Sequence, residues 1–173
     1  MKHPIKLITF DLDDTLWPVG EIMIKADAIL QAWLKQEHPI IQEQFSRQDI
    51  FSIRDQVLQE NTRIAHNLTE LRILTYCELF SRTGCTAAKA RQYAEDAFSV
   101  FYKARNTIEF FPGALSLLQS LTQNHTLIGL SNGNANLELV GIDHYFSHHH
   151  SAESIGLAKP HPAMFEAALA SRS

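Results

Sequence analysis

Cysteine, glycine and long apolar runs are all scarce in this chain of 173 residues. Its cysteines, Cys77 and Cys85, have the spacing of neither a metal site nor a disulfide framework. No run approaches the roughly 18 apolar residues that a membrane-spanning helix needs. Residues 1–4 lead into the first apolar segment without the pattern of a signal peptide. We therefore expect a cytoplasmic protein with reduced thiols and no membrane partner.

An excess of basic charge is missing as well. The chain has 15 Lys and Arg against 19 Asp and Glu, a formal net charge of -4. Nucleic-acid binding usually requires a basic surface, so we expect no nucleic-acid partner. What the chain does have is 45% hydrophobic and 20% charged residues, the balance of a globular protein with a core.

The first apolar segment, residues 5–10, runs directly into two carboxylates. It is predicted to be a strand covered on both faces, as in a parallel sheet. Asp11 and Asp13 follow it, and alternation along an extended chain places them on the same side. Like charges that close cost free energy unless a cation or a substrate uses them. Thr15, just beyond, completes a polar loop.

The middle of the chain has helical periodicity. Residues 21–105 contain no strand candidate, and their apolar spacing predicts four helices, near residues 22–33, 50–58, 68–82 and 86–101. Strand patterns return after this block. The later strands are expected at residues 126–131 and 145–149, and the later helices at 114–122, 135–140 and from 160 onward.

Without the helical block, strands and helices alternate. This order predicts an α/β fold with a doubly wound, parallel, Rossmann-like sheet. The helical block is then an inserted all-helical cap. We expect a core made of residues 1–17 and 107–173 and a cap made of residues 18–106.

Two further polar features follow later elements. Ser131, Asn132 and Gly133 form a turn after a strand and offer a hydroxyl and backbone N–H groups to an anion. Lys159 precedes Pro160 at the start of the last helix. Each signal is weak alone, because such turns and surface lysines are common. Doubly wound sheets, however, bind ligands at the carboxyl ends of their strands, where these residues fall.

In their order and separation these residues resemble the haloacid dehalogenase (HAD) superfamily, in particular its phosphatases with a helical cap of the C1 type. The segment 10–16, FDLDDTL, matches the first signature, D-x-D-x-T. Ser131-Asn132 matches the second and Lys159-Pro160 the third. Ser-Asn-Gly-Asn and the pair Leu71-Arg72 look most like the subgroup that acts on flavin mononucleotide, its precursor phosphates and similar small phosphates.

The resemblance implies a Mg²⁺-dependent phosphomonoester hydrolase. Asp11 would be the nucleophile that forms a phosphoaspartyl intermediate. Asp13 would protonate the leaving alcohol and then activate water. The Asp11 carboxylate and the Asp13 backbone carbonyl would hold Mg²⁺. The substrate would be a small phosphate ester.

The remaining site residues follow from the same resemblance. Ser131, the Asn132 N–H and Lys159 would bind the phosphoryl oxygens, and Thr15 would support the loop. Arg72, His66 and Trp17 are candidates for contact with the rest of the substrate. Packing for Trp17 and a solvated helix face for His66 remain the alternatives.

One part of the superfamily pattern is missing, its fourth signature of acidic metal ligands. Glu166 is the only acid after Lys159; it falls in the middle of the expected last helix, and no strand follows it. We therefore expect a core that is incomplete at its C-terminus, weak Mg²⁺ binding and weak or absent activity in this form. The first strand would become an open sheet edge, with possible self-association there.

Three functions remain open from the sequence. Hydrolysis of a phosphomonoester ranks first. A non-catalytic relative and a phosphomutase or phosphotransferase are the alternatives. Asp13 favours a phosphatase over a dehalogenase, because a halide leaves without a proton whereas an alkoxide benefits from an acid at this position.

Overall fold

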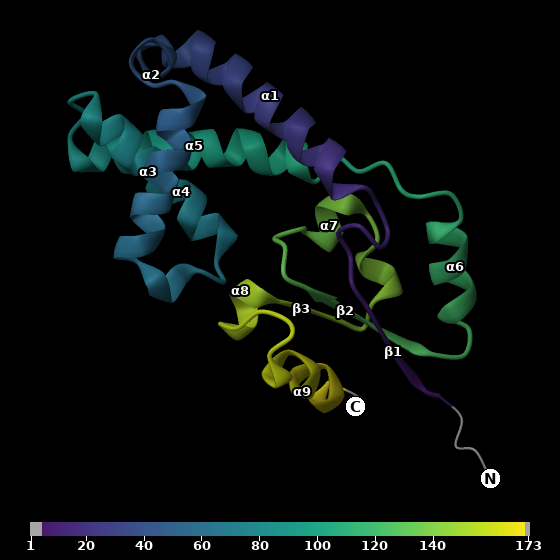
Figure 1. The fold of residues 1–173 in the computed structure, drawn as a ribbon. Helices are drawn as coiled ribbons and strands as arrows, with labels where there is room; N and C mark the ends of the chain where they lie inside the picture. The colour runs from purple at the N-terminus through teal and green to yellow at the C-terminus, as the bar shows by residue number, and fades with distance from the viewer. Residues whose placement is uncertain (1–4, 172–173) are drawn as a thin grey trace. The chain divides into compact units, whose positions relative to one another are not determined.

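The computed structural model describes residues 5–171, and the two ends of the expected core, residues 1–4 and 172–173, lie outside it. The chain forms two compact units (Figure 1). One comprises residues 1–22 and 106–173, and the other residues 23–105. Every strand of the described chain belongs to the first unit.

The first unit contains a parallel sheet of three strands, β1 (Leu7–Phe10), β2 (Thr126–Ser131) and β3 (His148–Ser151). The strands lie in the order β1-β2-β3. Thr9 pairs with Ile128 of β2, which pairs with the first residue of β3. The expected α/β class with a parallel sheet is confirmed.

Helices cover both faces of this sheet. On one face, α6 (Ala114–Leu121) and α7 (Leu137–Val140) share a core cluster with Leu127 of β2. On the opposite face, Met164 of α9 (Pro162–Ala170) packs against buried residues of β2. Because successive β2 side chains point to opposite faces, an apolar strand of this kind is stable only between two helical layers.

β1 is less covered than its apolar sequence suggested. Leu7 and Ile8 contact the clusters on opposite faces of the sheet, but none of the four β1 residues is buried and Thr9 is exposed. The reason is the strand order: within residues 5–171, β1 pairs with β2 alone and forms one edge of the sheet.

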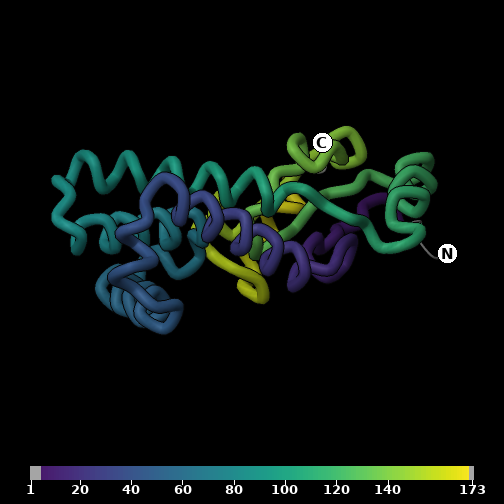
Figure 2. Tube along the Cα trace, turned by 90° about the horizontal axis from the view of Figure 1, so that it is seen from above, coloured from purple at the N-terminus to yellow at the C-terminus, as the bar shows by residue number. Residues whose placement is uncertain are grey.

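The second unit is helical throughout and has its own buried core. α4 (Leu68–Arg82) and α5 (Ala87–Arg105) pack against each other across the turn at Gly84, whose φ of 88° suits a residue without a side chain (Figure 2). A 3-10 turn at Thr62–Ile64 separates α3 (Arg47–Glu60) from α4. The helices are α1 (Val19–Glu37, which begins in the first unit), α2 (Pro39–Gln44), α3 (Arg47–Glu60), α4 (Leu68–Arg82) and α5 (Ala87–Arg105).

Three elements differ from the sequence prediction. The short helix α2, which begins at Pro39, was not expected, although proline suits the first helical turn. The third strand begins at His148 rather than at residue 145, because Asp143–Tyr145 form a 3-10 turn. The short helix α8 (Ala152–Ile155), capped by the side chain of Ser151, was not expected.

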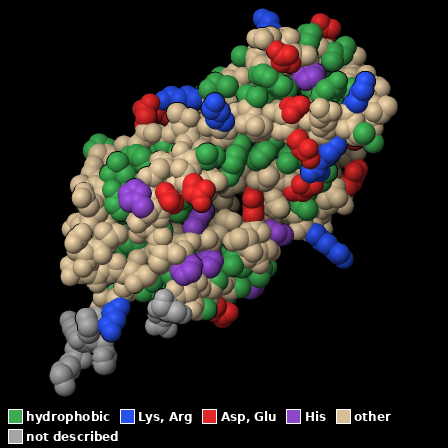
Figure 3. Space-filling model, turned by 180° about the vertical axis from the view of Figure 1, so that it is seen from behind, with side chains coloured by type: hydrophobic (Ala, Val, Ile, Leu, Met, Phe, Trp, Pro, Cys, Tyr) green, Lys and Arg blue, Asp and Glu red, His purple; other side chains and the backbone are tan. Residues whose placement is uncertain are grey.

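No helix in the described part of the chain is long and apolar enough to cross a membrane. On the face drawn in Figure 3, Lys and Arg side chains lie scattered among acidic ones instead of forming one basic patch.

Candidate active site

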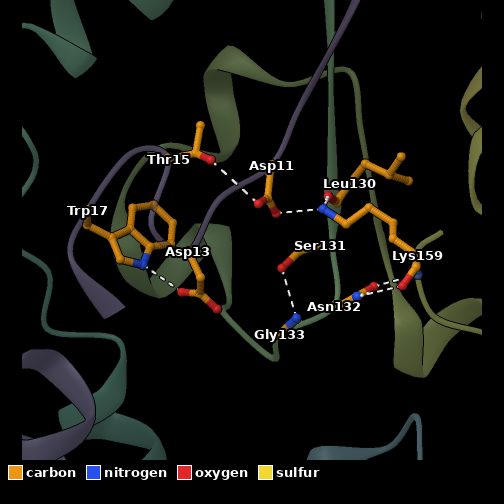
Figure 4. Close-up of polar contacts among 9 residues, drawn as sticks. All are labelled: Asp11, Asp13, Thr15, Trp17, Leu130, Ser131, Asn132, Gly133 and Lys159. Carbon is orange, nitrogen blue, oxygen red and sulfur yellow. Dashed lines mark hydrogen bonds and ion pairs between the residues drawn. The ribbon is translucent and has the colours of Figure 1, made fainter. Parts of the chain in front are cut away.

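The loop after β1 carries both aspartates at the carboxyl end of the sheet (Figure 4). Leu12 and Leu16 are buried and anchor the loop, and the Leu16 N–H donates to the Leu12 carbonyl at 2.8 Å. Asp14, with a φ of 58°, adopts the left-handed conformation that turns the chain. Because Leu12 is held in the core, Asp11 and Asp13 on either side of it point out of the core.

Lys159 reaches Asp11 from a distant part of the sequence. Its Nζ lies 2.6 Å from Asp11 Oδ1 and donates to the Leu130 carbonyl oxygen, also at 2.6 Å. The Lys159 side chain is 20% exposed and that of Asp11 46%. The two contacts hold the ammonium group between the ends of β1 and β2 (Figure 4).

Asn132 fixes the main chain of the same lysine. The Lys159 N–H donates to Asn132 Oδ1 at 2.7 Å, and Asn132 Nδ2 donates to the Lys159 carbonyl at 3.0 Å. The resemblance in sequence assigns only the Asn132 backbone N–H to the site. The role of its side chain was missed, because no local pattern reveals a contact across so many residues.

Ser131 is the last residue of β2 and is fully buried. Its Oγ accepts a hydrogen bond from the Gly133 N–H at 2.9 Å. A hydroxyl that accepts one hydrogen bond still carries its own proton and can donate it to an anion. In Figure 4 the Ser131 hydroxyl borders the same space as Asp11 and Asp13.

Thr15 and Trp17 contact the two aspartates. Thr15 Oγ1 lies 3.5 Å from Asp11 Oδ2, a weak hydrogen bond at the limit of the usual range. Trp17 Nε1 donates to Asp13 Oδ1 at 2.7 Å. The structure buries Trp17 completely in the core of the first unit, in line with the packing role that the sequence left open beside contact with the substrate. Contact of Trp17 with the substrate stays a prediction.

Arg72 and His66 belong to the second unit, and their roles remain predictions. The Arg72 guanidinium pairs with Asp27 at 3.3 Å and lies 3.5 Å from the centre of the Phe101 ring. His66 is half-buried just before α4. The residues described above around Asp11 all come from the first unit.

The oxygen donors of the loop fit Mg²⁺ in kind. The Asp11 carboxylate and the Asp13 backbone carbonyl are the hard ligands that this ion prefers. Their number is small: within residues 5–171, no group of three or more His, Cys, Asp or Glu side chains is arranged to hold a metal. Mg²⁺ tolerates so few protein ligands when water and a substrate phosphate complete its coordination.

Known proteins resemble the chain over nearly its whole length. The family model for haloacid dehalogenase-like hydrolases matches residues 5–171. The 5-amino-6-(5-phospho-D-ribitylamino)uracil phosphatase YigB of Escherichia coli K12 is 28% identical over 161 residues, which are 93% of this chain and 67% of that protein.

Solved structures share the fold. A 2-haloacid dehalogenase from Pseudomonas syringae pv. Tomato DC3000 is 34% identical, with a TM-score of 0.92 over 96% of this chain and 72% of that one. A HAD phosphatase from Thermococcus onnurineus, 16% identical with a TM-score of 0.59, covers 96% of this chain and 71% of its own and shows the fold alone. The chain belongs to the haloacid dehalogenase-like hydrolase family.

Proposed function

We propose that this hydrolase removes the phosphoryl group from a small phosphorylated metabolite through a phosphoaspartyl intermediate on Asp11. The contact between Asp11 and Lys159, at 2.6 Å, carries the proposal. It places a carboxylate nucleophile beside a cation, with Asp13 and the Ser131 hydroxyl bordering the same space. The similarity to a phosphatase over 93% of the chain supports it.

In the first step an Asp11 carboxylate oxygen attacks phosphorus. The bond between phosphorus and the ester oxygen breaks, and a proton from the Asp13 carboxyl group passes to the departing alkoxide. The products are an alcohol and an acyl phosphate on Asp11.

In the second step a water molecule attacks the phosphorus of the acyl phosphate. Asp13, now a carboxylate, takes the proton of that water. The bond between phosphorus and Asp11 breaks, inorganic phosphate leaves and both aspartates return to their starting states.

The phosphoryl oxygens need positive partners throughout. Lys159 provides the charge, and the Ser131 hydroxyl and the Asn132 N–H provide neutral donors at the end of β2. Donors fixed by the fold before the substrate arrives stabilise charge in the transition state without reorganising. The contacts of Lys159 with Leu130 and Asn132 provide such fixation.

Mg²⁺, held by the Asp11 carboxylate and the Asp13 carbonyl, would supply charge that offsets repulsion between the aspartates and the phosphate dianion. The small number of protein ligands supports weak binding of Mg²⁺ to the substrate-free chain, and with it low activity. The second unit, residues 23–105, would act as a cap that reads the alcohol part of the substrate, with Arg72 and His66 as candidate contacts.

Dehalogenation is the alternative function, because a 2-haloacid dehalogenase is 34% identical to this chain. Asp13 argues against it. A halide leaves as a stable anion and needs no proton, so a carboxyl group placed to deliver one has no use in that reaction.

An assay of p-nitrophenyl phosphate with Mg²⁺, run beside release of halide from 2-chloropropionate, tests the proposal. We expect phosphate release, no halide release, and loss of turnover to background in Asp11→Asn, which keeps the shape of the side chain but removes the nucleophile. Undiminished turnover in Asp11→Asn, or halide release without phosphatase activity, would contradict the proposal.

We also propose that β1 mediates weak self-association, since it is a sheet edge within the described residues. Sedimentation velocity over rising protein concentration tests this. Thr9→Lys, a charge on the exposed β1 residue, should suppress the larger species, whereas Gln119→Lys on α6 should not. A monomer at every concentration contradicts the idea.

A further inference from the structure

A buried tryptophan holds the acidic side chain that the proposed function uses for proton transfer. Trp17 is fully buried, and its Nε1 donates to Asp13 Oδ1 at 2.7 Å. Hydrogen bonds to a carboxylate are roughly twice as strong as neutral ones. A buried indole N–H without an acceptor costs about 1–3 kcal/mol, so the fold itself favours the Asp13 orientation that supplies this acceptor.

The indole cannot easily move. Its ring packs edge-on against Phe110 with the ring centres 5.8 Å apart, inside the core of the first unit. The backbone is tied as well, because the Asp14 N–H donates to the Trp17 carbonyl at 2.8 Å. Both the ring and its main chain are therefore fixed relative to the loop that carries Asp13.

The contact leaves the carboxylate with a defined direction. One oxygen of Asp13 faces Trp17, and in Figure 4 the other lies on the side away from the indole. In Figure 4, Ser131 and Asp11 are both drawn on that side of Asp13. An acid must point at the leaving oxygen before it can deliver a proton, so its orientation affects the rate directly.

We propose that Trp17 is a positioning residue for Asp13, aiming its carboxyl group at the leaving oxygen of the substrate. This inference rests on the proposed function, in which Asp13 protonates that oxygen. It assigns to the Trp17 N–H a part in the first chemical step, in addition to the packing of its ring.

The test compares two esters that differ in their need for the acid. p-Nitrophenolate leaves readily without protonation, whereas the alkoxide of glycerol phosphate does not. The parameter kcat/KM reports the steps up to release of the alcohol and excludes the later hydrolysis of the phosphoaspartate. We expect Trp17→Phe to lower kcat/KM for glycerol phosphate by about 10- to 100-fold, and that for p-nitrophenyl phosphate by less than about threefold.

Two controls separate positioning from packing. Phe110→Leu disturbs the same ring contact but keeps the N–H, so it should lower both kcat/KM values equally. Benzothienylalanine at position 17 keeps the bicyclic shape, with sulfur in place of the N–H, and should reproduce the Trp17→Phe pattern even if that variant folds poorly. Equal losses for both esters in this analogue would overturn the proposal.

A spectroscopic measurement tests the contact without turnover. The indole N–H proton resonance of Trp17 should move when Asp13 is changed to Asn, while that of Trp33, in the other unit, should stay in place. An unchanged Trp17 resonance would refute the hydrogen bond and the inference. If the wild-type protein hydrolyses neither ester, the proposed function fails instead, and the resonance alone decides whether Trp17 holds Asp13.

Discussion

Asn132 binds the main chain of Lys159 through both ends of its side-chain amide, at 2.7 and 3.0 Å. A lysine side chain is flexible, and it loses conformational entropy when it binds an anion. Part of this entropy is already lost in the folded protein before an anion binds. Asn132 holds the Lys159 backbone, and Leu130 and Asp11 hold its ammonium group. We therefore infer that Asn132 contributes to the proposed binding of phosphate through Lys159.

Asn132→Ala should weaken the binding of inorganic phosphate. The two lost hydrogen bonds contribute about 0.5–1.5 kcal/mol each, about 1–3 kcal/mol together, so we expect the dissociation constant to rise about 5- to 140-fold. Titration calorimetry with phosphate measures this directly and does not depend on turnover. Asn124→Ala, in the turn before β2, is the matched control and should bind as the wild type does. Equal affinities of the two variants would refute the role of Asn132.

We expect His149 to make the folded protein less stable in acid. Burial, and then the charge of His150, lower the pKa of His149 from 6.5. The unfolded chain therefore binds a proton at this ring at a higher pH than the folded chain does. The free energy of unfolding should thus fall as the pH drops below about 6.5.

His149→Phe, which keeps a ring of similar size but cannot be protonated, should reduce this acid dependence. Urea unfolding at pH 7 and pH 5 measures it. The loss of stability on acidification should be smaller in the variant than in the wild type, though not absent, because burial also lowers the pKa of His150. The same loss in both proteins would show that His149 does not titrate as described.

The residues of the site differ in how far the sequence could predict them. Asp11, Asp13 and Lys159 follow from motifs and from the rule that ligands bind at the carboxyl ends of strands. The Trp17 contact depends on a loop that turns the indole back to the carboxylate. That path is set by the left-handed Asp14 and the buried Leu16, and neither gives a signal in the sequence alone.

At the scale of elements, the packing of β2 against β3 requires a glycine at position 129. Gly129 of β2 pairs with His149 of β3, and a Cβ at Gly129 would lie 3.0 Å from His149 Cδ2. The contact places the imidazole over the strand, where a larger residue would displace it. The predicted strand included Gly129, but its reason for being glycine is visible only in the paired strand.

Gly129→Ala should destabilise the first unit by about 1–3 kcal/mol through overpacking. Gly20→Ala is the matched control, because nothing lies within 4 Å of a Cβ at that position in α1. Thermal unfolding of the two variants, followed by circular dichroism, compares them. Equal melting temperatures would mean that the ring of His149 moves aside without cost.

Elements with a strong, long period were predicted well, and short ones were not. The apolar stripes of α4 and α5 placed both helices within a few residues of their observed bounds. α2 and α8 are too short to show a period, and each depends on one terminal residue, Pro39 or Ser151. A single capping residue has several possible meanings in a sequence, so it predicts an element poorly.

At the scale of the whole molecule, the proposed chemistry and the proposed recognition of the substrate fall in different stretches of the chain. The residues around Asp11 come from both parts of the first unit, on either side of the long helical block. These residues lie far apart in the sequence, and the parallel pairing of β1 with β2 brings them together in the fold. We expect substitutions in residues 23–105 to change the substrate specificity more than the rate of the first chemical step. This is the behaviour of a cap that contacts the leaving group of the substrate.

The central claim is that Asp11 accepts the phosphoryl group, and trapping that intermediate tests it most directly. The protein is mixed with p-nitrophenyl phosphate and Mg²⁺, quenched in acid within the first turnover and digested for mass spectrometry. The account predicts one added phosphoryl group on Asp11 and none in Asp11→Asn. Turnover with an unmodified Asp11, or with the phosphoryl group on another residue, would contradict it.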